Sequence, residues 1–257
     1  MALGFSGWSL AGAGFLLLFV MPVATAIGWY AVNRTPGLEY WQARNDSTGQ
    51  APDPAAIREA VVQVYAARAF GWRGALGVHT WIAVKPSAAR HYTRYEVIGW
   101  GVARGNPALR IRGGLAADGY WFNSRPVKLV DLRGAGVDAI IAKIDGAARR
   151  YPHNDRYVLW PGPNSNTFTA YIGRAVPELK LELPPTAIGK DYIAAGGWFA
   201  RSPSGTGYQL AWRGLIGVML GWKEGVEVNV LGLTVGFDVL RPALKLPGLG
   251  RLGLGPV

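Results

Sequence analysis

A histidine and a serine are the side chains of this sequence best suited to nucleophilic chemistry. His79 lies in residues 77–85, where alternate positions are apolar as in a strand. Ser165 follows the stiff turn Trp160-Pro161-Gly162-Pro163 and opens a segment with helical spacing. Backbone N–H groups and the helix dipole at such a position can stabilise an oxyanion. The pattern predicts Ser165 as a nucleophile and His79 as its base.

A third polar group is expected to orient the histidine. His91 and Glu96 are the candidates, because they lie on the next predicted strand, residues 93–101, or on its approach. The other side chains expected at the same cleft are Trp81, Asn164, Asn166, Lys190 and Asp191.

The same residues also fit a structural role. Asn164 and Ser165 are short polar residues of the kind that cap helix starts, and His79 is compatible with an ordinary half-buried strand position. Two hypotheses follow. One is a serine-dependent hydrolase or acyl transferase; the other is a non-catalytic module that binds lipid, glycan or peptide, or stabilises an envelope assembly.

No metal or cofactor site is predicted. The chain has three histidines and no cysteine, which excludes thiolate ligands, and no His-x-x-x-His spacing occurs. Gly189-Lys190-Asp191 lacks the first glycine and the final Ser or Thr of a phosphate-binding loop. No glycine pattern matches a dinucleotide-binding fingerprint, so we expect no cofactor.

Four motifs resemble an uncharacterised bacterial family of membrane-anchored domains, domain of unknown function 3750. They are Val78-His79-Thr80-Trp81-Ile82, residues 94–101, residues 160–168 and residues 187–191. The resemblance covers the chain from about Val61 onward. It implies a bacterial envelope protein but brings no established activity.

A more distant similarity is to the circularly permuted papain-like group, which includes lecithin:retinol acyltransferase-type enzymes. His79 and Trp81 match that group's His-x-Trp strand, and Asn164 and Ser165 match its Asn-Cys helix start; Phe168 and His91 also occupy corresponding places. The group's nucleophilic cysteine is Ser165 here. The resemblance thus implies a papain-like cleft without thiol chemistry, and a serine needs a well-placed base to act.

The elements that must position these residues predict an α+β fold with an antiparallel sheet and two principal helices. The helices are expected over residues 134–151 and from Ser165 to about Arg174. Two long β-like runs, residues 208–222 and 226–240, are separated by Lys223-Glu224-Gly225, which predicts a C-terminal hairpin region. The tail, residues 246–257, is expected to be irregular.

The chain divides into four expected parts: residues 1–33, 34–57, 58–200 and 201–257. Residues 1–33 carry no charge, and residues 10–32 are long and apolar enough for a transmembrane helix or uncleaved signal anchor. Ala24-Thr25-Ala26 leaves open a cleaved signal peptide. A linker, the α+β domain and the C-terminal hairpin region follow.

The charge balance predicts anionic partners. The chain has 27 Lys and Arg against 16 Asp and Glu, a net charge of +11. No nucleic-acid-binding motif accompanies these charges, which excludes nucleic acid as an expected partner and leaves anionic lipids or envelope polymers. With the resemblance, this predicts a single-pass protein of the bacterial cytoplasmic membrane with its domain on the outer face.

Overall fold

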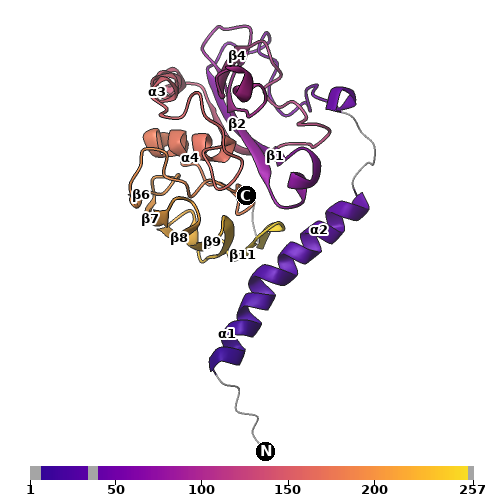
Figure 1. The fold of residues 1–257 in the computed structure, drawn as a ribbon. Helices are drawn as coiled ribbons and strands as arrows, with labels where there is room; N and C mark the ends of the chain where they lie inside the picture. The colour runs from indigo at the N-terminus through magenta and orange to yellow at the C-terminus, as the bar shows by residue number, and fades with distance from the viewer. Residues whose placement is uncertain (1–6, 34–39, 254–257) are drawn as a thin grey trace, which may run out of the picture.

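The apolar N-terminal segment forms one continuous helical rod. In the computed structural model, which describes residues 7–33 and 40–253, α1 (Gly7–Phe15) passes through a π-helical turn, η1 (Leu16–Val20), into α2 (Met21–Asn33). The part Leu10–Asn33 is long and apolar enough to cross a membrane, as the sequence predicts. In Figure 1 the lower end of this rod extends beyond the rest of the molecule and its upper end runs beside it.

A five-stranded antiparallel sheet forms the centre of the domain. Its strands lie in the order β4-β3-β2-β1-β5. They are β1 (Val61–Arg68), β2 (Val78–Lys85), β3 (Thr93–Val97), β4 (Leu109–Gly113) and β5 (Val127–Arg133). Together with the two helices described next, this sheet confirms the predicted α+β class.

One face of this sheet carries the two predicted helices, α3 (Val137–Arg149) and α4 (Ser165–Ala175). Ile82 of β2 packs in one core with Ile144 of α3 and Phe168 of α4. These apolar side chains recur at helical spacing in α3 and α4 and at every second position in the strands, so burial follows the sequence pattern.

The other face of the sheet is covered by loops. Tyr65 and Trp81 form a second, smaller core with Ala117, and Ile57 packs against it. Trp81 Nε1 donates a hydrogen bond to the Ala117 carbonyl oxygen at 2.7 Å. Because neighbouring side chains of a strand point to opposite faces, β2 serves both cores at once.

The segment predicted as a linker is fastened to this second face over the part that the structure describes. Residues 34–39 of that prediction lie outside the described residues. A short 3₁₀ turn, η2 (Tyr40–Gln42), is followed by residues that surround Asp118. The Asp118 carboxylate accepts hydrogen bonds from Ser47 Oγ at 2.7 Å and from the Gln50 backbone N–H at 2.5 Å. Residues 47–51 thus form part of the domain surface.

A second antiparallel sheet of seven strands follows, in the order β12-β11-β10-β9-β8-β7-β6. It lies below the first sheet and α4 in Figure 1. Its strands are β6 (Phe199–Arg201), β7 (Gly207–Trp212), β8 (Ile216–Gly221), β9 (Gly225–Val230), β10 (Leu233–Asp238), β11 (Ala243–Leu246) and β12 (Gly250–Gly253). Three further 3₁₀ turns among the described residues are η3 (Gly71–Ala75), η4 (Val102–Arg104) and η5 (Pro177–Leu179).

This sheet corrects two details of the sequence interpretation. Each predicted long run is itself a hairpin, because the chain reverses at Gly214 (φ 72°) and at Gly232 (φ 80°). Positive φ is readily adopted by glycine, so both turns form at residues that an apolar pattern alone does not distinguish. The tail predicted as irregular contributes β12, which pairs with β11; residues 254–257 lie outside the described residues.

Candidate functional site

The Asn-Ser-Asn-Thr block at the start of α4 acts as a structural clamp. Asn164 Oδ1 accepts hydrogen bonds from the backbone N–H groups of Asn166 and Thr167, at 3.0 and 3.1 Å, and so caps the helix. Asn164 Nδ2 donates to the carbonyl oxygens of Leu159 and Ile188, both at 3.0 Å. One side chain therefore joins the turn before α4 to the loop after it.

Asn166 extends this clamp to the sheet. Its Nδ2 donates to the carbonyl oxygens of Val78 and Ile188, at 3.0 and 2.8 Å. Its Oδ1 accepts from Thr80 Oγ1 at 3.0 Å. With both Asn side chains satisfied by protein atoms, neither offers a free group to a ligand.

Asn164→Ala is expected to destabilise the domain by about 2 kcal/mol, because it removes a helix cap together with two further buried hydrogen bonds. Urea unfolding followed by circular dichroism measures this change. Ser165→Ala is the matched control, because no hydrogen bond of the Ser165 side chain occurs within the described part of the chain. Equal stability of the two variants would contradict the clamp.

His79 and Ser165 lie on opposite faces of the five-stranded sheet. The Thr80 side chain reaches Asn166 and therefore points toward α4. His79, its neighbour in β2, points to the other face, where its ring stacks on Trp121 with centroids 3.7 Å apart. The predicted hydrogen bond between Ser165 and His79 is not formed, because Ser165 lies in α4 and β2 directs His79 to the opposite face of the sheet.

The structure brings His79 and Glu96 together. His79 Nε2 lies 3.4 Å from Glu96 Oε2, and both side chains are buried. Burial lowers the pKa of His79, which the hydrogen bond and charge of Glu96 only partly offset, so the ring is neutral near pH 7. His91, the other candidate partner, is exposed at a separate shallow pocket.

The remaining predicted binding residues lie elsewhere. Trp81 is fully buried under Arg94, whose guanidinium carbon lies 4.7 Å from the ring centroid. Lys190 pairs with Glu227 of β9 beneath the second sheet, and Asp191 is buried beside it. Burial raises the pKa of Asp191. Lys190 and Asp191 thus attach the loop after α4 to the second sheet and do not share a cleft with His79.

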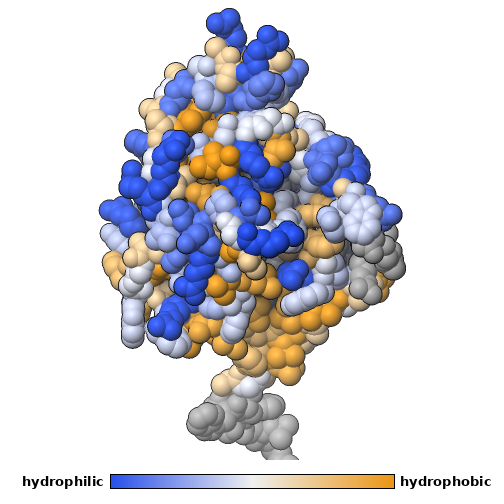
Figure 2. All heavy atoms as spheres, turned by 45° about the horizontal axis from the view of Figure 1, so that its top comes forward, coloured by the Kyte–Doolittle hydropathy of each residue, from blue (hydrophilic) through white to orange (hydrophobic). Residues whose placement is uncertain are grey.

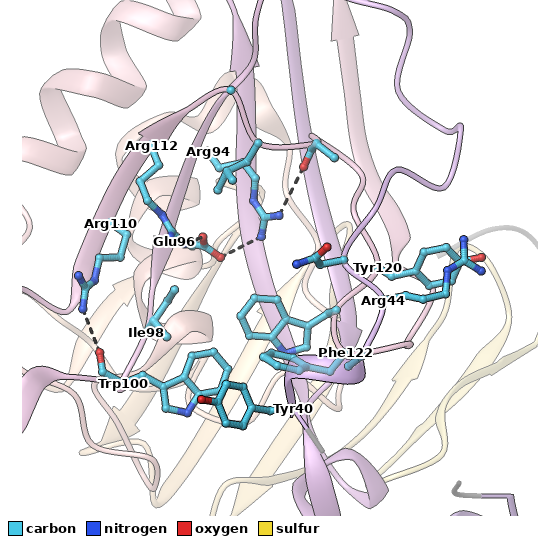
Figure 3. A pocket seen from close by; sticks show the side chains of 16 residues that line it. Tyr40, Arg44, Arg94, Glu96, Ile98, Trp100, Arg110, Arg112, Tyr120 and Phe122 are labelled. Atoms are coloured by element: carbon cyan, nitrogen blue, oxygen red, sulfur yellow. Dashed lines mark hydrogen bonds and ion pairs between the residues drawn. The ribbon is translucent and has the colours of Figure 1, made fainter. Parts of the chain in front are cut away.

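A pocket of about 560 Å³ opens over β3 and β4 (Figure 3). It lies on the same face of the sheet as His79, because Glu96 in its lining contacts His79. Two kinds of side chain line it. Its charged residues are Arg44, Arg94, Glu96, Arg110 and Arg112. Its aromatic residues are Tyr40, Trp100, Tyr120, Trp121 and Phe122. A volume of this size suits a small molecule or one unit of a polymer.

Glu96 is the one carboxylate in the lining of this pocket, and two arginines donate hydrogen bonds to it. Arg94 Nη2 donates to Glu96 Oε2 at 2.9 Å, and Arg112 Nη2 donates to Oε1 at 2.7 Å. Burial alone would raise the pKa of Glu96, but His79 and the two arginines lower it to about 2. A carboxylate held ionised in this way is a poor general base and a good positioning group for arginine.

The lining of the pocket contains more arginines than carboxylates. Arg94 and Arg112 lie directly opposite each other on β3 and β4, and Arg110 lies opposite Glu96. Arg110 Nη2 donates to the Trp100 carbonyl oxygen at 2.9 Å. The buried Nε atoms of Arg94 and Arg110 have no hydrogen-bond partner among the described residues. Three guanidinium groups thus face one carboxylate, which leaves positive charge for an added anion.

Stacked rings form the other wall of the pocket. Trp121 stacks between His79 and Trp100, at centroid distances of 3.7 and 5.8 Å, and Phe122 meets Trp100 edge-on at 5.1 Å. Arg44 lies 4.0 Å over the Tyr120 ring and pairs with Asp46. Aromatic faces of this kind hold sugar rings or apolar groups.

The sequence interpretation missed the arginines as site residues. Arg94 and Glu96 on one strand and Arg110 and Arg112 on the next share one face at two-residue spacing, and this alternation could have identified them. Their convergence also requires the pairing of β3 with β4, which the sequence leaves open. The aromatic residues come from loops, for which no periodic pattern exists.

Comparison with known proteins gives a family but no activity. No curated protein and no solved structure matches the chain, so the papain-like likeness stays a prediction. One family model matches residues 59–192, which include the five-stranded sheet, His79 and the arginines of β3 and β4. As the sequence motifs predicted, the chain belongs to the family described as protein of unknown function DUF3750.

Proposed function

We propose that this chain is a membrane-anchored, non-catalytic binding protein, located on the outer face of the bacterial cytoplasmic membrane. Its ligand carries a phosphate or carboxylate group on a sugar or glycerol body. This chemistry is shared by two sources in an envelope, anionic polymers and the headgroups of anionic lipids. The ligand group binds at Arg94, Arg110 and Arg112, and its body lies against Trp100.

The observation that carries the proposal is the charge imbalance of the pocket. Three arginines, Arg94, Arg110 and Arg112, surround the single carboxylate of Glu96. Arginine binds carboxylate and phosphate oxygens with its planar fork, and it stacks on aromatic rings. An anion would neutralise charges that Glu96 alone does not, while the exposed Trp100 ring adds contact area.

Contacts of the N-terminal helix support a retained anchor over a cleaved signal peptide. Ala26, the last residue of the small-residue sequence that a signal peptidase could cut, is buried. Tyr30 Oη, one turn further on, donates a hydrogen bond to the Gly71 carbonyl oxygen at 2.5 Å. Packing of this helix against the domain on both sides of the possible cleavage point supports its retention in the mature protein.

The position of Ser165 supports the non-catalytic hypothesis. A serine nucleophile requires a base within hydrogen-bond reach, and His79, the predicted base, faces the other side of the sheet. Asn164 and Asn166 on either side of Ser165 have structural partners. A hydrolase or acyl transferase at Ser165 would therefore need a different base.

Binding is tested with the full chain in lipid nanodiscs by isothermal titration calorimetry. The probes are glucose 6-phosphate, glucuronate, glycerol 3-phosphate and neutral glucose. We expect the anionic probes to bind, more weakly as salt rises because mobile ions screen the arginines. Glucose should not bind. Tighter binding of glucose 6-phosphate and glucuronate would indicate an anionic polymer. Tighter binding of glycerol 3-phosphate would indicate a lipid headgroup.

Two outcomes would count against the proposal. Equal affinity for glucose and glucose 6-phosphate would mean that the arginines do not recognise an anion. Covalent labelling of the wild-type chain by a fluorophosphonate, lost in Ser165→Ala, would show a reactive serine and restore the catalytic hypothesis.

A further inference from the structure

The seven-stranded sheet has its polar side inward and its apolar side outward. Its inward positions include Glu227, Asn229, Asp238 and Lys245, all buried. Cross-strand pairing places six outward side chains in one row from β7 to β12: Tyr208, Leu220, Val226, Phe237, Leu244 and Leu252. Each is at least 37% exposed. A sheet in water normally shows the reverse arrangement.

The apolar face is as large as the patches by which proteins contact a membrane or a partner. A second outward row runs beside the first and contains Leu210, Val218 and Val228, each at least 41% exposed. Six strands of about 20 Å at a spacing of about 4.8 Å give a face on the order of 500 Å². Contiguous apolar patches of this size mark contact with another apolar phase or partner.

The N-terminal helix indicates which apolar phase this is. Its central turn, η1 (Leu16–Val20), lies beside β10, and Ala26 lies against Gly248 in the turn between β11 and β12. Leu16 and Leu17 in that turn are themselves exposed, 52% and 56%. The sheet therefore sits level with the middle and second half of a membrane-length helix. In Figure 2 hydrophobic residues gather toward the lower part of the molecule, and hydrophilic residues dominate above.

We propose that the outward face of β7–β12 is immersed in the lipid of one membrane leaflet, as a second membrane contact of the domain. The inference rests on the membrane anchor of the proposed function. Lipid is the occupant because the exposed helix turn and the sheet lie at one level, so the phase that surrounds the helix also reaches the sheet. In Figure 1 β4, at the rim of the arginine pocket, lies at the opposite end of the molecule, where water-borne anions can reach it.

Single-cysteine variants test this directly, because the chain has no native cysteine. Val218→Cys lies on the outward face and Leu17→Cys on the helix. Ala103→Cys, exposed in η4, is the matched control. The full chain carrying each variant is labelled with an environment-sensitive NBD fluorophore. It is then reconstituted in phosphatidylethanolamine–phosphatidylglycerol vesicles with and without spin-labelled lipids that quench within the hydrocarbon region.

The expected result is that labels at positions 218 and 17 lose fluorescence to a similar extent, whereas the label at position 103 keeps its fluorescence. Quenching at 17 but not at 218 would overturn the sheet contact and leave the anchor intact. Blue-shifted emission at 218 without lipid quenching would also overturn it, because a second copy or another protein would then cover the face. Absence of quenching at 17 would refute the anchor and, with it, this inference.

Discussion

Glu227→Gln is expected to lower the free energy of unfolding by roughly 3–5 kcal/mol, the cost of breaking a buried ion pair on one side. Glu227 of β9 lies between two buried lysines. Lys190 Nζ contacts its Oε2, and Lys245 Nζ donates to its Oε1 at 2.7 Å. A neutral amide would remove the negative charge that Glu227 presents to both buried ammonium groups.

Glu227 lies where the second sheet joins the rest of the domain, so the loss of stability should affect unfolding of the whole domain. Lys190 belongs to the loop that Asn164 and Asn166 hold against α4, whereas Glu227 and Lys245 belong to the second sheet. Charges of Glu227 and Asp191 raise the pKa of Lys190 even though burial opposes this, so it stays protonated. The ion network therefore joins this loop to the second sheet.

Thermal and urea unfolding of the full chain in nanodiscs measure the effect of Glu227→Gln. The control is Glu178→Gln, which breaks the surface ion pair with Lys143 and should leave the midpoint almost unchanged. If both variants unfold at the wild-type midpoint, the ion network of Glu227 does not stabilise the contact between the loop after α4 and the second sheet.

Glu96→Gln is expected to cost about 3 kcal/mol and to flatten the acid side of the stability profile. Arg94 and Arg112 converge on this carboxylate, and Figure 3 shows the guanidinium of Arg94 directed at it. The glutamine would keep the shape of the side chain but remove the charge that holds two opposed arginines together.

The pH dependence follows from the lowered pKa of Glu96. The folded state holds this pKa at about 2, against 4.5 for an unperturbed glutamate. The resulting stability, about 3 kcal/mol, is fully present above pH 4.5 and is lost as pH falls toward about 2. The lowered pKa of His79 acts in the same direction below its ordinary value of 6.5, because the unfolded chain then binds the proton more readily.

Urea unfolding at a series of pH values between 7 and 3 tests this dependence. Wild type should lose more stability than Glu96→Gln as the pH falls below about 4.5, whereas the two profiles should run parallel above that pH. Profiles that stay parallel down to pH 3 would show that Glu96 is not held ionised by its neighbours.

Periodicity predicted most of the fold because burial follows it. The alternation in residues 77–85 correctly separates Thr80 and Ile82 from His79 and Trp81, and the helical spacing of residues 137–149 matches α3. The same alternation places His79 on the face of β2 opposite Thr80, and Thr80 is the residue that contacts α4. His79 therefore points away from α4.

The polarity of the second sheet and the arginine pocket could not be predicted, because both depend on contacts between distant segments of the chain. The inverted polarity of β7–β12 is visible in the sequence as alternation, but alternation alone does not say which side is buried. Glu227 and Lys245 are inward because they meet charges from residues 182–191. Likewise, the pocket forms only when loop residues such as Trp121 meet the β3–β4 edge.

The proposed functional site is the arginine pocket and not Ser165. It is tested most directly by titrating glucose 6-phosphate into wild type, Arg112→Ala, Ser165→Ala and the surface control Arg149→Ala. Arg112 is half-exposed, so its removal should spare the fold.

We predict that Arg112→Ala weakens binding at least about tenfold, the loss of one charge-assisted hydrogen bond, while Ser165→Ala and Arg149→Ala bind as wild type does. Unchanged binding in Arg112→Ala, or a loss of binding confined to Ser165→Ala, would contradict the account.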